Sequence, residues 1–350
     1  MSLTNTGTGA TLNQNTITGS TTFTCQNAGS YNLSMAIPTG YRVTNRTVSP
    51  GGFGLVLNNG VSFALGPSQT ATFCISKVNP WYQTTTGDVR KVSITNKVPA
   101  GFYASSDALY PSLFLSSNWN SDFGSGQASA LGWKVDSEYD YNKNSQNRNG
   151  TANYSYYMSR LNQTGVTPTA LSNCNATSCV LTNLATGVYT VTGPITITSY
   201  SQAAGAHVVL LVNGDATIKT SIKVPAGAHN LFVLAAKGNV TIDRSVGEAL
   251  FSSSVTDVEG VITAEGSVTA DGGQCLGGSP DLRLNIGGMV VANALKPFAT
   301  AGTGIFTNNR SLCANDITTP AVTFSPRLDF ITELTDFYKT ISSRWKEVNP

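Results

Sequence analysis

The chain has 350 residues, of which 40% are apolar and 11% charged, with a formal net charge of +2. Ordinary globular proteins carry roughly 25% charged residues, so this surface must consist mostly of Thr, Ser, Asn, Gln and Gly. No basic stripe with interleaved aromatics is present, and we expect no nucleic-acid partner. No run approaches the ~20 apolar residues of a spanning helix, and we expect no membrane span in this chain.

The N-terminal part, residues 1–79, predicts two modules. Residues 1–20 are a polar, glycine-rich arm, expected to be mobile or docked as an edge strand. Residues 21–79 alternate apolar and polar positions, as in YNLSMAI (31–37), between turn signals such as PTG and PGG. This pattern predicts a small β-sandwich, immunoglobulin-like or prealbumin-like. Because residues 1–87 contain no Asp or Glu, carboxylate-based catalysis is excluded there.

A repeated phrase follows, since KVPAG occurs at 97–101 and again at 223–227. The second copy has relatives downstream, each with an apolar run, a glycine and an alternating segment: VVLLVNGDATIK, FVLAAKGNVTID, GVITAEGSVTAD and a weaker GMVVANALKPF that begins at Gly288. Coils of roughly 20–30 residues bury their apolar face only by stacking. The repeats therefore predict an all-β chain in which the sandwich is followed by a parallel β-solenoid (β-helix-like).

The repeat also predicts positions within each coil. Gly214, Gly238 and Gly266 are expected at corners with φ > 0, with Ala294 in the fourth equivalent place. Two side-chain stacks are expected beside them, one of Asp215, Asn239 and Ser267 and one of Lys219, Asp243 and Asp271.

The first KVPAG phrase is interpreted as the first coil of the same solenoid. Residues 80–101 form that coil on this interpretation, residues 102–186 are an insertion, and residues 187–324 are the remaining coils. Residues 82–101 should then neighbour 208–228.

The expected insertion contains two candidate binding clusters. Five tyrosines form either a ligand-stacking surface or, as we favour, a cover for the side of the solenoid: Tyr139, Tyr141, Tyr154, Tyr156 and Tyr157. Three acidic residues could bind calcium, although an acidic surface loop is the commoner reading: Asp136, Glu138 and Asp140.

Six cysteines form three pairs that are local in sequence. We expect disulfides Cys25–Cys74, Cys174–Cys179 and Cys275–Cys313, although six cysteines allow fifteen connectivities, and six reduced thiols are the alternative. Disulfides predict an oxidising, extracellular compartment. No signal-peptide pattern is visible, so a secreted form would be mature or trimmed. The sequence has neither the CxxC or His-rich spacing of a zinc site nor the CxxCH motif of haem attachment, and we expect no cofactor.

The tail, 325–350, predicts a helix that caps the open end of the solenoid. Ser325 can be its N-cap and Pro326 its first residue, and Leu328, Ile331 and Leu334 recur at helical spacing.

Four stretches carry a resemblance to a known family: NPWYQTTTGDVR, SDFGSG, DVEGVITAEGSV and RLDFITEL…RWKEVNP. Over roughly residues 79–350 the chain resembles predicted cell-surface β-solenoid proteins of candidate-phylum, reduced-genome bacteria, with their PW-x-Q…GDV and C-terminal W-x-E-V-x-P-like motifs. The resemblance implies an exported, surface-displayed β protein. It offers no catalytic residues to carry over.

We therefore expect a non-enzymatic extracellular protein, a structural subunit of a filament, appendage or surface layer, with adhesion as a further role. The arm is the expected contact for a homo-polymer, and a host-cell or glycan surface is a candidate partner.

The alternative is a carbohydrate-active enzyme, a hydrolase or lyase, that uses Asp243 and Asp271 as paired carboxylates, with Glu259 and Glu265 as a second pair. His207 and His229 are the only histidines, and corner positions are a better interpretation of them than a two-imidazole metal site.

Overall fold

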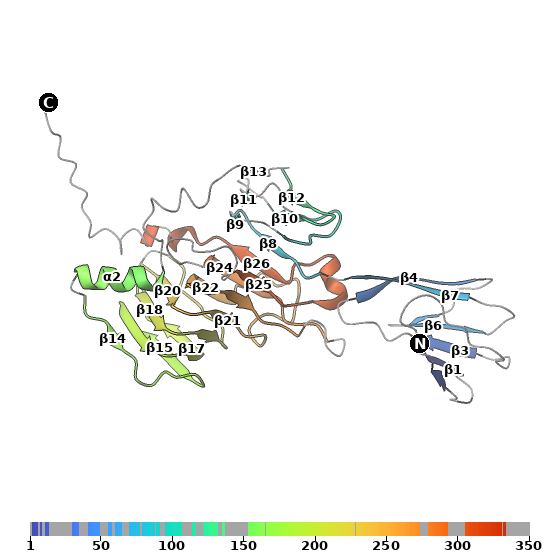
Figure 1. Ribbon diagram of the computed structural model, residues 1–350, viewed down its shortest axis with the longest axis horizontal. Helices are drawn as coiled ribbons and strands as arrows, with labels where there is room; N and C mark the ends of the chain where they lie inside the picture. Colours follow the sequence, from blue (N-terminus) through green and yellow to red (C-terminus); the bar gives the residue numbers. More distant parts are fainter. Residues whose placement is uncertain are drawn as a thin grey trace, which may run out of the picture. The chain divides into compact units, whose positions relative to one another are not determined.

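A computed structural model of the chain describes residues 79–136, 153–292 and 305–333, except for short internal gaps, together with Thr8 and the strands between residues 2 and 77 (Figure 1). The gaps are residues 88, 92–94, 107–113, 117–121, 132–134, 165, 228, 274–278 and 331. The chain divides into two compact units, Met1–Asn79 and Pro80–Pro350, at the boundary expected from the sequence.

The first unit contains two antiparallel sheets. One has the order β2 (Thr11–Asn13), β1 (Ser2–Asn5), β3 (Ser30–Ser34), β6 (Gly60–Ala64) and β5 (Leu55–Leu57). The other pairs β4 (Tyr41–Ser49) with β7 (Thr70–Lys77). The arm therefore supplies two strands of its own unit. The packing of the two sheets as a sandwich remains a prediction.

The second unit is a parallel β-solenoid, as the repeats predict. Its main sheet has ten strands, all parallel to their neighbours, in the order β14 (Thr169–Ala170), β16 (Gly187–Thr192), β18 (His207–Asn213), β20 (Leu231–Ala236), β22 (Val258–Ala264), β24 (Leu284–Val291), β26 (Val322–Ser325), β8 (Tyr82–Thr84), β10 (Tyr103–Ser105) and β12 (Gln127–Ser129).

Two further parallel sheets form a second wall of the solenoid. One contains β15 (Cys179–Leu184), β17 (Ile195–Gln202), β19 (Ala216–Ile218), β21 (Val240–Ile242), β23 (Val268–Ala270) and β25 (Phe306–Asn308), and the other contains β9 (Val89–Lys91), β11 (Phe114–Ser116) and β13 (Val135–Asp136). Each main-sheet strand except β26 is therefore followed in the chain by one strand of this wall.

Burial explains why these short segments are strands. In β19, β21 and β23 the first and third residues are buried and the central threonine is not, which is the period-two pattern of a strand with one face on a core. The central threonines pair in register across five coils and form an outward row: Thr196, Thr217, Thr241, Thr269 and Thr307. By contrast, β20 is buried at every position, because the main sheet is covered on both faces, as parallel sheets usually are.

The order of the coils differs from the sequence prediction. β8 pairs in parallel with β26, with Tyr82 opposite Val322 and Phe324 opposite Thr84. The first coil therefore stacks on the last, and β18 lies five strands away from β8 in the sheet. The prediction that residues 82–101 neighbour 208–228 is wrong. Side chains between distant segments decide the order, and a repeat pattern cannot show it.

The expected insertion, 102–186, is in large part solenoid. β10, β11, β12 and β13 extend the stack beyond β8, whereas β14 and β15 extend it at the opposite end. The two KVPAG copies nevertheless occupy the same place in their coils. Val98 and Val224 are buried, and Gly101 and Gly227 take the positive φ of a turn, 81° and 104°, before the next main-sheet strand.

Aromatic residues mark the junction between the last coil and the first. Tyr82 lies edge-on to Phe306 and Phe324, with ring centroids 6.2 and 6.1 Å apart. Trp81 is 1% exposed, and its indole N–H donates to the carbonyl oxygen of Asp316 at 2.9 Å. Asp316 belongs to the short 3-10 helix η2 (Cys313–Ile317). This packing specifies which two coils meet.

The corner glycines are required for space and not for positive φ. Gly214, Gly238 and Gly266 are absent from the positive-φ positions, so that expectation is wrong. A Cβ on Gly238 would lie 2.9 Å from the carbonyl carbon of Gly214, and the other two are equally crowded by the neighbouring coil. In the stack of Asp215, Asn239 and Ser267, the next place belongs to Ile305, whose carbonyl oxygen accepts from the amide of Val268 at 3.1 Å. Ala294, the expected fourth corner position after Gly266, lies outside the described residues.

One helix and the start of the tail cover the main sheet. α2 (Tyr154–Thr164) packs against β18, and Tyr157 and Leu161 join the solenoid core. In the tail, residues 328–330 and 332–333 are helical, and Phe330 is buried where Gly288 leaves room for its ring. The rest of the predicted capping helix lies outside the described residues, and its described start lies alongside the coils.

Candidate functional site

The two predicted side-chain stacks exist and lie on either side of the wall strands β19, β21 and β23. In the first, Asp215 accepts from the backbone amide of Asn239 at 2.7 Å, and the Asn239 side chain accepts from the amide of Ser267 at 2.9 Å. These bonds satisfy backbone donors at the corners, which would otherwise be left without partners. The first stack is therefore structural.

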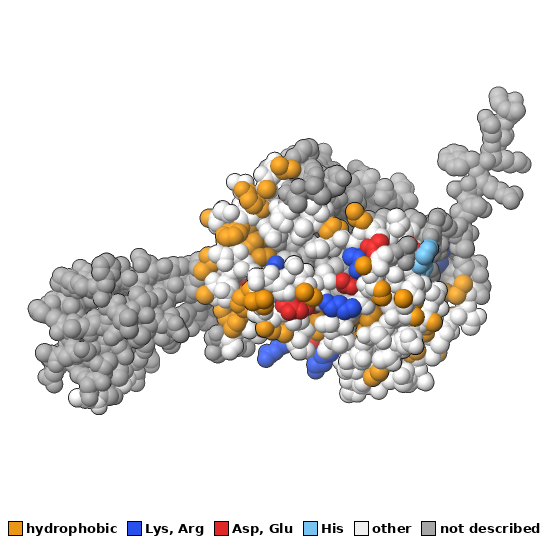
Figure 2. Space-filling model, turned by 180° about the vertical axis from the view of Figure 1, so that it is seen from behind, with side chains coloured by type: hydrophobic (Ala, Val, Ile, Leu, Met, Phe, Trp, Pro, Cys, Tyr) orange, Lys and Arg blue, Asp and Glu red, His pale blue; other side chains and the backbone are white. Residues whose placement is uncertain are grey.

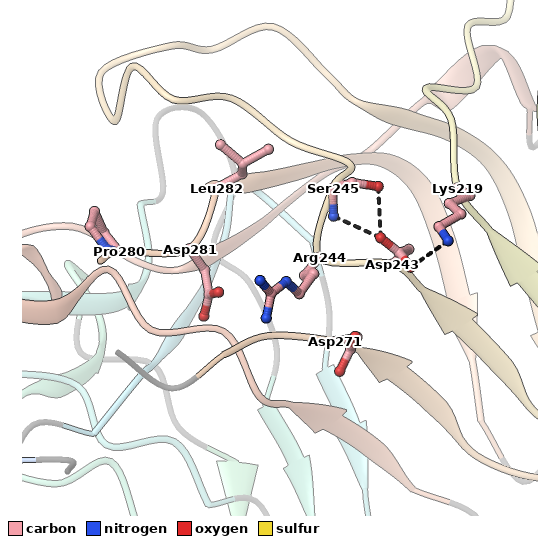
Figure 3. Close-up of a pocket in the computed structure, with 8 residues that line it drawn as sticks. All are labelled: Lys219, Asp243, Arg244, Ser245, Asp271, Pro280, Asp281 and Leu282. Carbon is pink, nitrogen blue, oxygen red and sulfur yellow. Dashed lines mark hydrogen bonds and ion pairs between the residues drawn. The ribbon is translucent and has the colours of Figure 1, made fainter. Parts of the chain in front are cut away.

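The second stack borders a cleft of about 490 Å³ (Figure 3). The amides of Lys219, Asp243 and Asp271 each donate, at 2.9 Å, to the carbonyl oxygen of the residue just before the equivalent position in the preceding coil, which is Ile197, Ile218 and Ile242 in turn. The three residues are thus in register, as predicted. The rest of the cleft is lined by Arg244, Ser245, Pro280, Asp281 and Leu282, so the chemistry available in it is that of carboxylates and cationic groups.

Asp243 is held as a carboxylate. Burial raises its pKa, but hydrogen bonds from the amide and hydroxyl of Ser245, at 2.9 and 2.6 Å, and the charges of Lys219 and Arg310 outweigh burial, and the pKa lies below its usual range. The Lys219 ammonium lies 3.9 Å from Asp243. A general acid needs a raised pKa, so Asp243 does not suit that role.

Arg310 is a residue of this region that sequence reading missed. Its side chain is fully buried and donates to the carbonyl oxygens of Val246, Leu282 and Asp243 at 2.6, 2.9 and 2.8 Å. Burial lowers its pKa to about 10, and Asp281 is the largest of the acidic charges that oppose this. A guanidinium beneath the cleft therefore joins three turns of chain. Nothing in its sequence context, NNRSLC, marks Arg310 as buried.

The second predicted acid pair is not brought together for catalysis. Glu259 accepts from the amide of Val224 at 2.6 Å and lies 3.3 Å from the Arg327 guanidinium. Glu265 is buried and accepts from the amide of Ser155 at 2.9 Å, at the N-terminus of α2, where a negative charge is favourable. Each carboxylate thus fastens one covering element to the solenoid.

Three of the five tyrosines lie on α2. Tyr157 is 1% exposed and belongs to the solenoid core, and Tyr154 and Tyr156 are partly buried against that core. Tyr139 and Tyr141 lie outside the described residues, as do Glu138 and Asp140 of the calcium cluster. Asp136 ends β13. The described tyrosines therefore occupy the covering position that we favoured.

One of the predicted disulfides is present, Cys174–Cys179, with its Cα atoms 4.1 Å apart. Within its loop the Asn175 side chain accepts from the amides of Thr177 and Ser178 at 2.9 and 3.1 Å. Cys25 and Cys275 lie outside the described residues, and the other two pairs remain predictions.

His207 and His229 lie on adjacent coils at the start of β18 and just before β20, as their shared context predicted. Their ring centroids are 6.3 Å apart. The structure adds a third group that the sequence did not point to, because Glu333 of the tail lies 2.9 Å from His207 and 3.7 Å from His229. Figure 2 shows histidine side chains at the surface in pale blue.

Among the described residues no helix is long and apolar enough to cross a membrane. No protein-family model, curated protein or solved structure matches the chain.

Proposed function

We propose that the chain is a non-enzymatic extracellular protein, a structural subunit of a filament, appendage or surface layer that also serves in adhesion. The observation that carries this proposal is the use made of the acidic residues. Asp243, Glu259 and Glu265 each hold a turn, the tail or α2 in place. A continuous stack of ten parallel strands with its acids engaged in this way suits a load-bearing element.

Surface chemistry supports the same proposal. The outer face of the wall carries the threonine row and few charges, so copies of the protein repel one another little. The Cys174–Cys179 disulfide fits an oxidising, extracellular location. The resemblance to cell-surface solenoid proteins of reduced-genome bacteria also favours this proposal. A glycan or a host-cell surface is the partner that we propose.

Assembly through the arm would proceed by strand exchange. β1 pairs with β3 over four residues and with β2 over three, so it is already placed in its own unit. An arm that leaves one copy and pairs with β3 of the next would link copies without new interface chemistry, as in domain swapping. Such a contact is head-to-tail, and it generates an open filament when its rotation does not close into a ring.

Deletion of residues 2–20 tests the assembly step. We expect the full chain to form polymers visible by electron microscopy and light scattering, and the truncated chain to remain monomeric with an unchanged solenoid by circular dichroism. If the full chain stays monomeric at high concentration and shows no filaments or lattices, assembly fails and a singly displayed adhesin takes its place.

The competing function is a polysaccharide hydrolase or lyase, favoured by one observation: Asp243 and Asp271 line the same cleft. Lys219 beside them and the lowered pKa of Asp243 oppose it. A polysaccharide screen decides between the two, because turnover that Asp243→Asn abolishes would establish an enzyme. We expect no turnover.

A further inference from the structure

Three side chains with metal-binding atoms meet at one corner of the solenoid. His207 begins β18, His229 lies two residues before β20, and Glu333 comes from the tail. The Glu333 carboxylate oxygen Oε2 lies 2.9 Å from His207 Nε2 and 3.7 Å from His229 Nδ1. One ligand atom from each residue lies within 4.8 Å of the other two. Such spacing lets a single ion contact all three.

The atoms that face this point lack hydrogen-bond partners. Glu333 Oε2 and His207 Nε2 are both buried, and neither makes a hydrogen bond of acceptable geometry to any described residue. The Glu333 side chain is 7% exposed. A buried carboxylate oxygen without a hydrogen bond costs free energy and is rare in folded proteins. The 2.9 Å approach itself matches two ligands of one ion, which lie roughly 2.9–3.4 Å apart at Zn–N and Zn–O distances of about 2.0–2.1 Å.

Backbone structure holds the two imidazoles in place. β18 and β20 pair in register, with His207 opposite Leu231, which fixes the two coils at that corner. The backbone of His229 has a φ of 65°, a conformation that costs a non-glycine residue free energy and often marks a functional position. The rings are inclined at 34° to each other, and each presents a nitrogen to Glu333.

The tail is held so that Glu333 reaches the pair. Arg327 donates to the carbonyl oxygens of Val224 and Pro225, both at 3.3 Å, and its guanidinium lies 4.3 Å from the centre of the Phe330 ring. Phe330 is 2% exposed. These two anchors lie three and six residues before Glu333, so the carboxylate is directed by packing that does not involve the histidines.

We propose that His207, His229 and Glu333 form a binding site for a divalent transition-metal ion, with Zn²⁺ as the best fit. Two imidazole nitrogens and one carboxylate oxygen are the donor set that Zn²⁺ accepts, whereas Ca²⁺ and Mg²⁺ prefer oxygen ligands alone. The His229 side chain is 73% exposed, which gives the ion a path from solvent and leaves room for water to complete its coordination. The ion would fasten the tail to two adjacent coils.

Isothermal titration of the full, untagged chain with Zn²⁺ alone tests the site, after treatment with a chelator. We expect one ion per chain, and we expect His207→Ala and Glu333→Gln each to weaken binding at least tenfold. Co²⁺ in place of Zn²⁺ should give visible d–d absorption that the same variants lose. Glu248→Gln, a carboxylate-to-amide change in a different turn, is the matched control and should bind as the unaltered chain does.

Stability measurements keep the proposal falsifiable if a variant folds poorly. Zn²⁺ should raise the Tm of the unaltered chain and of Glu248→Gln by several degrees, and it should leave the Tm of a His207→Gln, His229→Gln double variant unchanged. The proposal is overturned if the double variant binds Zn²⁺ as tightly as the unaltered chain. It is also overturned if Glu333→Gln lowers the Tm equally with chelator and with Zn²⁺, since the cluster would then be an ion pair between Glu333 and His207.

Discussion

Replacement of Trp81 by alanine should loosen one end of the solenoid and leave the other intact. Trp81 is 1% exposed, lies 6.0 Å from Phe102 by ring centroids, and donates to the Asp316 carbonyl oxygen. A buried tryptophan removes about 150–250 Å² from water, worth roughly 4–6 kcal/mol at about 25 cal/mol per Å². Measured Trp→Ala changes cost about 3–5 kcal/mol, and we expect a loss of about 4 kcal/mol here.

The loss should be local because each coil of a solenoid contacts only its neighbours. Native-state hydrogen exchange should show a lower free energy of opening for β8, β10, β12 and β26, with β16 and β18 unchanged. Trp81→Phe keeps most of the packing and loses the hydrogen bond, which is worth about 1 kcal/mol, so its effect should be smaller.

Leu131→Ala is the control in the same segment, since Leu131 is 60% exposed, and it should change stability by no more than about 0.5 kcal/mol. The reasoning is refuted if Trp81→Ala costs less than about 1 kcal/mol. It is refuted equally if β16 and β18 lose as much protection as β8, because the first coil would then not be stacked beside β26.

Three further predictions concern single groups. Burial raises the pKa of Asp316 to about 6 despite hydrogen bonds from Ser311 and Leu312. Because the folded state then binds a proton more readily than the unfolded state, protonation of Asp316 stabilises the fold. The contribution of Asp316 to the free energy of unfolding should therefore rise by roughly 1–3 kcal/mol as pH falls from about 7 towards 4. Urea titrations of Asp316→Asn should show a flatter pH dependence, and an unchanged profile would contradict the shift. Gly238→Ala should cost about 1–3 kcal/mol by chemical denaturation because its Cβ meets the neighbouring coil, whereas Gly87→Ala, with its nearest atom at 3.8 Å, should cost far less. Non-reducing peptide mapping should recover Cys174 linked to Cys179, and reduction of that short loop should lower stability by about 2 kcal/mol; free thiols there would refute it.

For α2 and the tail, the sequence predicted the covering role but not the contacts that hold these segments on the solenoid. The five tyrosines predicted a segment that covers the side of the solenoid, and the apolar spacing of the tail predicted a capping helix. Tyr157 and Phe330 are buried as such residues should be, but the helix α2 itself was not predicted. Their anchors were not foreseeable. Glu265, which accepts from Ser155 at the start of α2, is 110 residues from Ser155 in sequence, and Val224 is 103 residues from Arg327. Such contacts form only after the coils have stacked, because stacking brings these distant segments together.

The sequence by itself determined the coil. Alternation in strands such as β21, a glycine before β19, β21 and β23, and the side-chain stack from Asp215 to Ser267 all follow from nearest-neighbour stacking, which repeats in the sequence wherever it repeats in space. The tertiary structure alone decided the order of the coils and the meeting of Glu333 with His207. Both depend on contacts between segments more than 100 residues apart, as when β8 closes on β26. Local periodicity carries no information about such contacts, because every coil edge offers the same backbone hydrogen bonds, and packing between particular side chains, such as Tyr82 on Phe324, selects one pairing.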